Sequence, residues 1–310
     1  MREVDLSKYN VRTDLVIDLV ENQNIDKISY YNGIKISNLD LNKKDAKKLG
    51  KKPGFYTTIY FNDITDSTNY ESVLTVLIKQ LKKVFKESKI EKEASCMIIG
   101  LGNENSTADE LGVKTAKKVV VTKHINDLVG NLEKGFRIST CFTPGVMGDT
   151  GIETSDVIES IIKVVKPDFI IVIDALASSN INNLLKTIQI TNTGINPGSG
   201  VGNKRKELSM KVYNIPVIVI GVPTVVEAST IVSETLLSLQ KYFKTNIKDK
   251  DFINVINELS EIDKKALIEE IIGYNLIVTP KDIDFIIAKL SNLIAEAINK
   301  TIHNISTKNT

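Results

Sequence analysis

Three short, uninterrupted apolar runs constrain the fold of this chain more than any other feature. They span residues 94–99, 169–173 and 216–220. Continuous rather than alternating apolarity is typical of a strand that is covered on both faces. Amphipathic segments that predict helices fall between or after these runs, over residues 107–121, 153–165 and 225–239. We therefore expect an α/β fold, a three-layer α/β/α sandwich around a mostly parallel sheet.

Further elements flank this pattern on both sides. Residues 33–41 and 54–61 predict strands, because β-branched and aromatic residues cluster there between turn signals. Residues 69–86 predict a helix, and the basic run at 43–52 predicts a solvated loop, with a docking surface for an acidic partner as the alternative. A Thr-Pro-Lys-Asp string at 279–282 predicts the start of long C-terminal helical structure. Since no repeat or Pro/Gly/Ser linker divides the chain, we expect one domain.

Composition excludes several classes of protein. Lys and Arg total 40 against 38 Asp and Glu, so the net charge of +2 does not suggest a nucleic-acid partner. The longest apolar runs are far shorter than the ~18 residues that a membrane span needs. The acidic N-terminal residues leave no legible export signal. We expect a cytoplasmic protein whose two cysteines are reduced.

Histidine and cysteine are too scarce for most metal or nucleophile chemistry. The chain has two histidines, His124 and His303, and two cysteines, Cys96 and Cys141. A three-histidine site and a Cys-x-x-Cys pair are both impossible, so we expect neither a metal nor a cofactor. His124 and a Cys141 nucleophile stay as alternatives to catalysis by carboxylates, hydroxyls, lysines and backbone amides.

Ligands of open α/β sheets collect beyond the carboxyl ends of the strands, so the residues that follow each apolar run come first. After the first run, Gly100 and Gly102 are typical of a dinucleotide loop, but Asn105 stands where its third glycine is needed. Thr107-x-x-Glu110 matches a capping box, which would give the neighbouring Asp109 a structural role.

Asp174 is the strongest single candidate for a functional acid. It follows five apolar residues without a break, at the end of a predicted interior strand. Burying its charge is costly unless the carboxylate is paired, hydrogen-bonded or protonated. Capping or a salt bridge is the alternative role.

Two glycine-rich segments, at 143–151 and 193–206, complete the candidates. They contain Gly148, Asp149, Gly198, Gly200 and Gly202, and the second is not a Walker A loop because Arg205 stands where Ser or Thr binds magnesium. Successive glycines allow backbone amides to approach a carbonyl or an oxyanion closely. Plain turns are the alternative.

Together these segments resemble the germination protease family, the endopeptidases that degrade small acid-soluble spore proteins when a bacterial spore germinates. The resemblance rests on VRTDL at 11–15, GLGN at 100–103, GVMGDTG at 145–151, DAL at 174–176, NPGSGVGNKR at 196–205 and IGVPTVV at 220–226. It implies a fold similar to that of the hydrogenase-maturation proteases, and it places two catalytic aspartates on Asp109 and Asp174. The family's first motif usually reads Thr-Pro-Asp-x-Leu-Gly-Pro, from which Ala108 and Val113 depart.

Two close carboxyl groups that share a proton can activate water without histidine, thiolate or zinc. We assign Asp174, at the more apolar strand end, to the neutral acid and Asp109 to the base, although the roles are exchangeable. Amides near Gly148 and Gly200 would hold the oxyanion.

The resemblance also implies a zymogen that removes an N-terminal segment and assembles as a tetramer. Family members cut after an acid and before a large apolar residue, with another acid nearby, and TDLVID at 13–18 has that form. We expect self-cleavage between Asp14 and Leu15 after acidification or dehydration, which makes 1–14 a propeptide and 15–310 a single α/β protease domain. A nucleotide- or phosphate-binding α/β enzyme and a catalytically silent binding protein are the alternatives.

Overall fold

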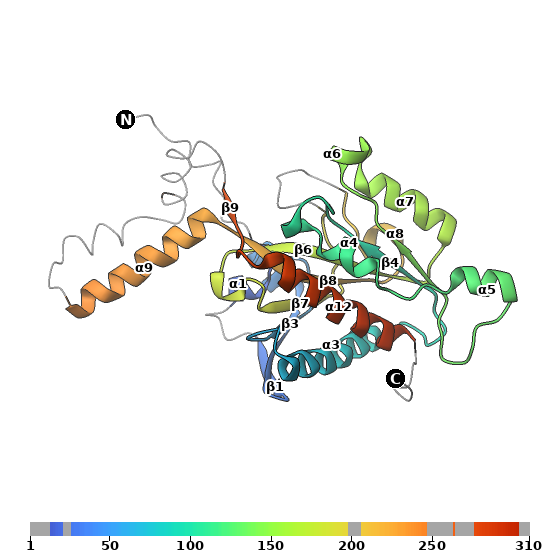
Figure 1. Cartoon of the computed structure of the whole chain (residues 1–310), viewed down its shortest axis with the longest axis horizontal. Coiled ribbons are helices and arrows are strands. Elements are labelled where there is room, and N and C mark those ends of the chain that lie inside the picture. The colour runs from blue at the N-terminus through green and yellow to red at the C-terminus, as the bar shows by residue number, and fades with distance from the viewer. Residues whose placement is uncertain (1–12, 21–25, 198–205, 247–262, 264–275, 304–310) are drawn as a thin grey trace.

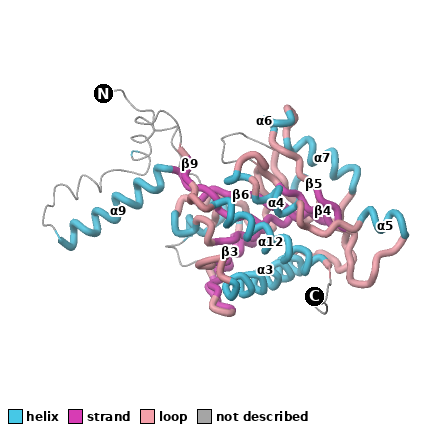
Figure 2. The backbone as a smooth tube through the Cα atoms, in the orientation of Figure 1, coloured by secondary structure: helices cyan, strands magenta, loops and turns pink. Residues whose placement is uncertain are grey.

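The computed structural model describes residues 13–20, 26–197, 206–246, 263 and 276–303 (Figure 1). The nine strands among these residues form a single sheet. Its order is β1-β2-β3-β7-β8-β6-β4-β5, and β9 pairs with β8 outside this path. The helices lie on both faces of the sheet (Figures 1 and 2), so the expected α/β fold is confirmed.

The parallel half of the sheet is built from the three apolar runs and one short edge strand. Its strands are β4 (Cys96–Gly100), β5 (Ser139–Phe142), β6 (Phe169–Ser178) and β8 (Val217–Glu227). The pairs β4–β5, β4–β6 and β6–β8 are all parallel. The prediction of a helix from residue 225 is wrong at its start, because Val225 and Val226 still pair with β6.

The other half of the sheet is antiparallel, so the sheet is mixed rather than mostly parallel. Its strands are β1 (Lys27–Tyr31), β2 (Ile34–Leu41), β3 (Gly54–Tyr60), β7 (Thr187–Thr191) and β9 (Ile277–Val278). An Asn32-Gly33 turn with φ of 49° and 78° joins β1 to β2, and such two-residue turns match the twist of an antiparallel hairpin. The predicted strands at 33–41 and 54–61 are thereby confirmed as β2 and β3.

One face of the sheet carries α3 (Ser67–Glu87), α4 (Leu111–Ala116) and α12 (Ile283–Ile302). Alternate residues of β4 and β6 point into this core, including Ile98 and Ile171. α12 begins at Ile283, four residues later than the cap predicted from Thr279, because the Thr279 hydroxyl instead donates a hydrogen bond to the Thr224 carbonyl.

The opposite face is covered in two places. Over the parallel half, Ile158 of α7 (Thr154–Val165) packs on Met97, Ile99 and Ile170. Over the antiparallel half, α1 (Ile17–Val20) packs beside α2 (Lys43–Lys48). The solvated loop expected at 43–52 is therefore partly a helix, which begins where the Asn42 side chain accepts the Lys44 and Asp45 amides.

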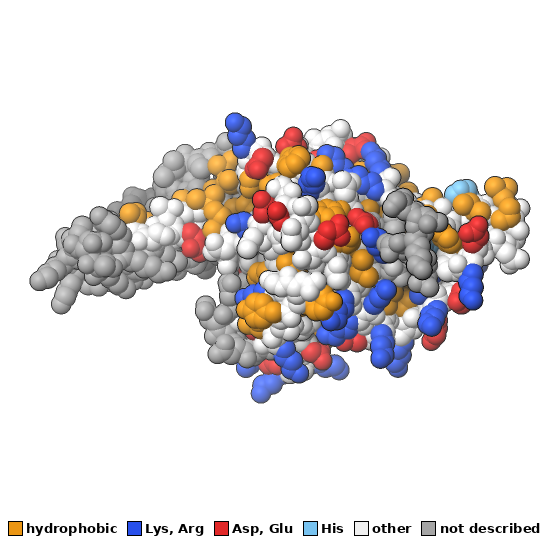
Figure 3. Space-filling view, turned by 60° about the horizontal axis from the view of Figure 1, so that its bottom comes forward, with side chains coloured by type: hydrophobic (Ala, Val, Ile, Leu, Met, Phe, Trp, Pro, Cys, Tyr) orange, Lys and Arg blue, Asp and Glu red, His pale blue; other side chains and the backbone are white. Residues whose placement is uncertain are grey.

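The predicted helix at 107–121 is shorter than expected. It consists of the 3-10 turn η2 (Thr107–Asp109) and α4, after which the chain turns to hydrogen-bond with Ser139 of β5. The remaining elements are α5 (Lys123–Val129), α6 (Met147–Thr150), η3 (Ile181–Asn183), α8 (Met210–Tyr213) and α9 (Ala228–Asn246). α9 extends away from the sheet (Figure 1). On the face drawn in Figure 3, basic and acidic side chains are interspersed, as the near-balanced composition suggests.

Candidate active site

Asp174 lies in β6 just beyond the point where its neighbour β4 ends. β4 pairs with β6 up to Gly100, opposite Ile173, so Asp174 is the first residue of β6 beyond that pairing. The residue is 8% exposed, and its carboxyl group accepts a hydrogen bond of 3.0 Å from the Ala175 amide. Burial raises the pKa of Asp174 well above its ordinary value, and the charges of Asp109 and then Asp14 raise it further. The site therefore favours a protonated Asp174.

Asp109 ends η2, and the loop that follows β4 fixes its position. The Asn103 amide donates to its carboxylate at 2.9 Å. The neighbouring Ala108 carbonyl accepts the Thr224 hydroxyl of β8 at 2.6 Å. The capping box predicted from Thr107 and Glu110 does not form, since neither η2 nor α4 has a side-chain cap. Asp109 instead lies close enough to Asp174 for its charge to raise the Asp174 pKa.

Two glycines allow this close approach. Gly102 has φ of +113°, and a Cβ built on it would lie 1.8 Å from the Asp109 carbonyl oxygen. A Cβ on Gly112 would lie 2.3 Å from the Leu101 oxygen and 2.5 Å from the Ile173 oxygen. The loop that resembles a dinucleotide fingerprint is thus packed against the chain's own backbone.

The bond predicted for self-cleavage lies beside these acids. The Asp14 amide donates to the Ala177 carbonyl of β6 at 3.0 Å, and the Ala177 amide donates to the Asp14 carboxylate at 2.9 Å. The Asp14 charge contributes to the raised pKa of Asp174. The structure therefore brings Asp14, Asp109 and Asp174 together from three distant parts of the chain.

The residue that follows the predicted bond is fully buried. Leu15 has no exposed surface and belongs to an apolar cluster on the face of α1 and α2. The other members are Val16, Ile17, Val20, Leu39, Leu41, Ala46, Tyr56 and Leu176. The apolar residue that follows the predicted cleavage point is therefore enclosed by other apolar side chains.

Asp18 anchors the same segment by its carboxylate. It accepts hydrogen bonds from the Ser178 hydroxyl at 2.9 Å, the Ser179 amide at 2.8 Å and the Asn183 side chain at 2.7 Å. The Thr13 hydroxyl adds a bond of 2.5 Å from the other side of the predicted cleavage point. Asp18, four residues after Asp14, is therefore surrounded by hydrogen-bond donors.

Lys51 and Gln189 contact the carbonyl of Asp14, and the sequence analysis missed both. The Lys51 ammonium donates to the Thr13 oxygen at 2.7 Å and to the Asp14 oxygen at 3.2 Å. The Gln189 amide nitrogen lies 3.5 Å from the Asp14 oxygen. Burial lowers the pKa of Lys51, while the charges of Asp14 and Asp18 oppose that shift. Nothing in the basic run at 43–52 singled out Lys51.

The structure describes only some of the residues predicted in the glycine-rich segments. Gly148 and Asp149 lie in α6, and both are exposed. Gly198, Gly200 and Gly202 lie outside the described residues. The assignment of these residues to oxyanion binding stays a prediction.

The alternative nucleophiles have unfavourable surroundings. Burial raises the pKa of the Cys141 thiol to about 11. His124 is exposed on α5, and His303 is buried, where its Nδ1 accepts the Arg137 amide. Among the residues with described positions, no three His, Cys, Asp or Glu side chains gather as metal ligands.

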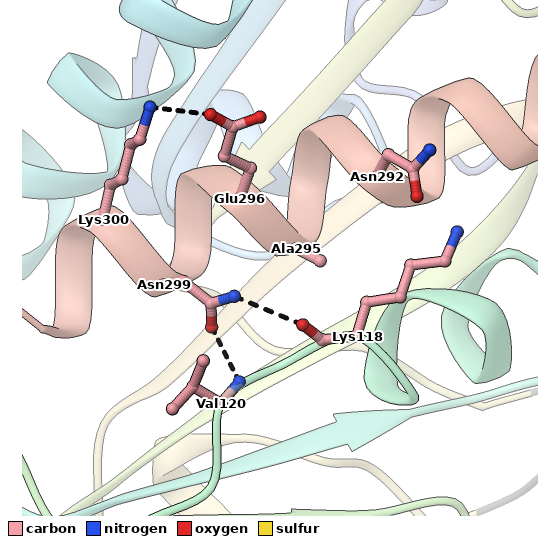
Figure 4. A pocket seen from close by; sticks show the side chains of 7 residues that line it. All are labelled: Lys118, Val120, Asn292, Ala295, Glu296, Asn299 and Lys300. Carbon is pink, nitrogen blue, oxygen red and sulfur yellow. Dashed lines mark hydrogen bonds and ion pairs between the residues drawn. The ribbon is translucent and has the colours of Figure 1, made fainter. Parts of the chain in front are cut away.

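A pocket of about 380 Å³ lies between α12 and the turn after α4 (Figure 4). Asn299 bridges the two sides, accepting from the Val120 amide at 2.9 Å and donating to the Lys118 carbonyl at 3.2 Å. None of the predicted site residues lines it. Its polar contacts hold α12 in place.

The family model and the related sequences agree on one family. The family model for germination protease matches residues 20–254 and 245–310. The germination protease of Geobacillus sp. (strain WCH70) is 39% identical over 97% of this chain and 96% of its own length. That of Bacillus subtilis (strain 168) is 39% identical over 97% and 95%, respectively. The crystal structure of a NiFe hydrogenase maturation protease, HycI, from Thermococcus kodakarensis matches 71% of this chain and 98% of that chain, with 14% identity and a TM-score of 0.33.

The family matches define a peptidase on an α/β fold. More specifically, the chain belongs to the germination protease family. None of the helices in the described ranges has an apolar stretch that could cross a bilayer.

Proposed function

We propose that this chain is a zymogen endopeptidase in which Asp109 and Asp174 activate water, and that its first substrate is its own Asp14–Leu15 bond. The observation that carries this proposal is the docking of Asp14 on β6, where its amide and carboxylate both bond to Ala177, three residues beyond Asp174. The burial of Leu15 and the anchoring of Asp18 fit the same purpose. Segment 13–18 is held in the manner of a bound substrate.

The chemistry follows from the different environments of the two acids. Burial and the charges of Asp109 and Asp14 raise the pKa of Asp174, which favours its protonated form, whereas the Asp109 carboxylate accepts the Asn103 amide. Water attacks the Asp14 carbonyl carbon as Asp109 takes its proton, and Asp174 gives a proton to the Leu15 nitrogen as the C–N bond breaks. The two carboxyl groups can exchange these roles.

Membership of the family extends the proposal to substrates in trans. We propose small acid-soluble spore proteins as substrates, the spore core as the location, and a homotetramer as the working assembly. A substrate with an acid before the scissile bond, a large apolar residue after it and a second acid nearby would use the contacts that now hold Asp14, Leu15 and Asp18.

Asp109→Asn and Asp174→Asn variants test the aspartate pair. We expect the wild-type chain to yield a new N-terminus at Leu15 and neither variant to do so, as read by N-terminal sequencing. Full processing in either variant, or a mature N-terminus elsewhere, would contradict the proposal. Incubating the processed enzyme with a small acid-soluble spore protein and sequencing the fragments tests the substrate class, and sedimentation tests the tetramer.

A further inference from the structure

The peptide bond between Asp14 and Leu15 is bracketed by one buried side chain. Gln189 of β7 is 6% exposed, and its oxygen accepts the Val16 amide at 2.8 Å while its nitrogen lies 3.5 Å from the Asp14 oxygen. Because both ends of the amide are engaged, the side chain has little freedom to rotate. It therefore holds a donor facing the carbonyl that must be attacked.

A positive charge from the loop after α2 reaches the same oxygen. Lys51 follows α2, and its own amide bonds to the Ala46 carbonyl at 2.9 Å, which fixes the loop that carries it. Its ammonium lies between the carbonyl oxygens of Thr13 and Asp14, at 2.7 and 3.2 Å. The charged groups that act on it are Asp14 and Asp18, both of opposite sign.

We propose that Lys51 and Gln189 stabilise the negative charge that develops on the Asp14 carbonyl oxygen during self-cleavage. This inference rests on the proposed function and adds the groups that stabilise the carbonyl oxygen when water attacks. When the water oxygen bonds to the carbonyl carbon, the carbonyl electron pair moves to the oxygen that faces these two donors. When the C–N bond breaks, the pair returns to the carbonyl, Leu15 leaves as an amine and Asp14 gains an α-carboxyl group.

The contact distances suit this role. Catalytic hydrogen bonds are often long before the transition state and shorten as charge develops. Donors that are already oriented in a partly buried site need no rearrangement at that moment, and removing one such donor typically costs about 10²- to 10³-fold in rate. Lysine adds a full charge to the hydrogen bond, so its loss is expected to have the larger effect of the two.

The test compares Lys51→Met and Gln189→Glu with Lys48→Met, which removes an exposed lysine of the same basic run. In Gln189→Glu, one oxygen can still accept the Val16 amide, while the donor toward Asp14 is lost. The first-order rate of appearance of the Leu15 N-terminus is measured in the full chain. We expect Lys51→Met to slow it by about 10²-fold or more, Gln189→Glu to slow it less, Lys51→Arg to restore part of the rate, and Lys48→Met to match the wild type.

A second measurement separates charge stabilisation from docking. Hydrogen exchange at the Val16 amide reports whether the segment is docked, and it is measured in the Asp174→Asn background, where the bond stays intact. A slow Lys51→Met variant with unchanged protection of Val16 supports the inference. Wild-type cleavage by Lys51→Met, or slow cleavage accompanied by lost protection, overturns it. If Asp109→Asn and Asp174→Asn also cleave normally in the same assay, the proposed function itself fails.

Discussion

The position of Asp109 depends on a glycine that no catalytic argument names. A methyl group added at Gly102 would lie 1.8 Å from the Asp109 carbonyl oxygen, whereas real Cβ atoms essentially never approach closer than 3.0 Å. In Gly102→Ala the Asp109 backbone must therefore move by about 1.2 Å. That movement pulls on the bonds from the Asp109 amide to Ser106 and from Thr224 to Ala108. A misplacement of roughly 1 Å can cost about 10²-fold in rate.

We expect Gly102→Ala to fold and to process its Asp14–Leu15 bond about 10²-fold more slowly than the wild type, with a stability loss of ~1–3 kcal/mol from overpacking. Processing is followed by N-terminal sequencing, and stability by urea unfolding. Gly130→Ala is the matched control, because Gly130 also has a positive φ, +80°, but has nothing within 4 Å of the added carbon. The control carries the backbone strain without the clash. Wild-type processing by a folded Gly102→Ala would refute the placement of Asp109 in the reaction.

Three further outcomes are expected. Between the ordinary carboxyl pKa of 3.8 and the raised pKa of Asp174, the folded chain binds more protons than the unfolded chain, so the free energy of unfolding falls as pH rises. Asp174→Asn removes this slope, so we expect it to be more stable than the wild type at neutral pH in urea titrations, although we also expect it not to process itself. Asp18→Asn replaces the carboxylate that accepts the Ser179 amide and the Asn183 side chain, with an expected loss of ~1.5–3 kcal/mol of charged hydrogen bonding. We expect weaker docking of segment 13–18, measured by hydrogen exchange at the Val16 amide, and slower processing, measured by N-terminal sequencing. Burial raises the pKa of Cys96 to about 12 and of Cys141 to about 11, so an alkylating reagent should label both only after denaturation, as mass spectrometry can show.

Three of the four strands in the parallel half could be predicted because their signals are local, whereas the short edge strand β5 was missed. A strand covered on both faces has to be apolar at every position, and β4, β6 and β8 each carry such a run. The antiparallel half gave weaker signals. β7 was not predicted, because its alternation of Thr187, Gln189 and Thr191 with isoleucines is polar on one side, yet all five of its residues are buried. The sequence alone does not show whether a polar side chain is exposed or is buried with a hydrogen-bond partner.

The predicted helix boundaries were wrong where tertiary contacts compete with helix propensity. The segment at 107–121 has the periodicity of one long helix, but its residues beyond α4 bond to β5 and to α12 instead. The capping signal at Thr279 was also overridden, because that hydroxyl bonds to β8. The Thr279 error lies next to the Asp109 loop, because Thr224 also bonds to Ala108. The error beyond α4 lies at the other end of β4, where Ser139 pairs with Cys96.

Asp174 could be recognised from the residues next to it in the sequence, whereas Lys51 could not. Asp174 was recognisable because an acid that ends an apolar run is anomalous in itself. Lys51 is one of six lysines between residues 43 and 52, and Lys48 is indistinguishable from it in sequence terms. The difference arises only when the loop after α2 turns back on Ala46, which brings the Lys51 ammonium to the carbonyl oxygens of Thr13 and Asp14. Asp14 is in turn held by Ala177 of β6. A contact that depends on three distant segments leaves no recognisable pattern in the sequence. Two lysines only three residues apart, Lys48 and Lys51, are therefore expected to respond very differently to the same substitution.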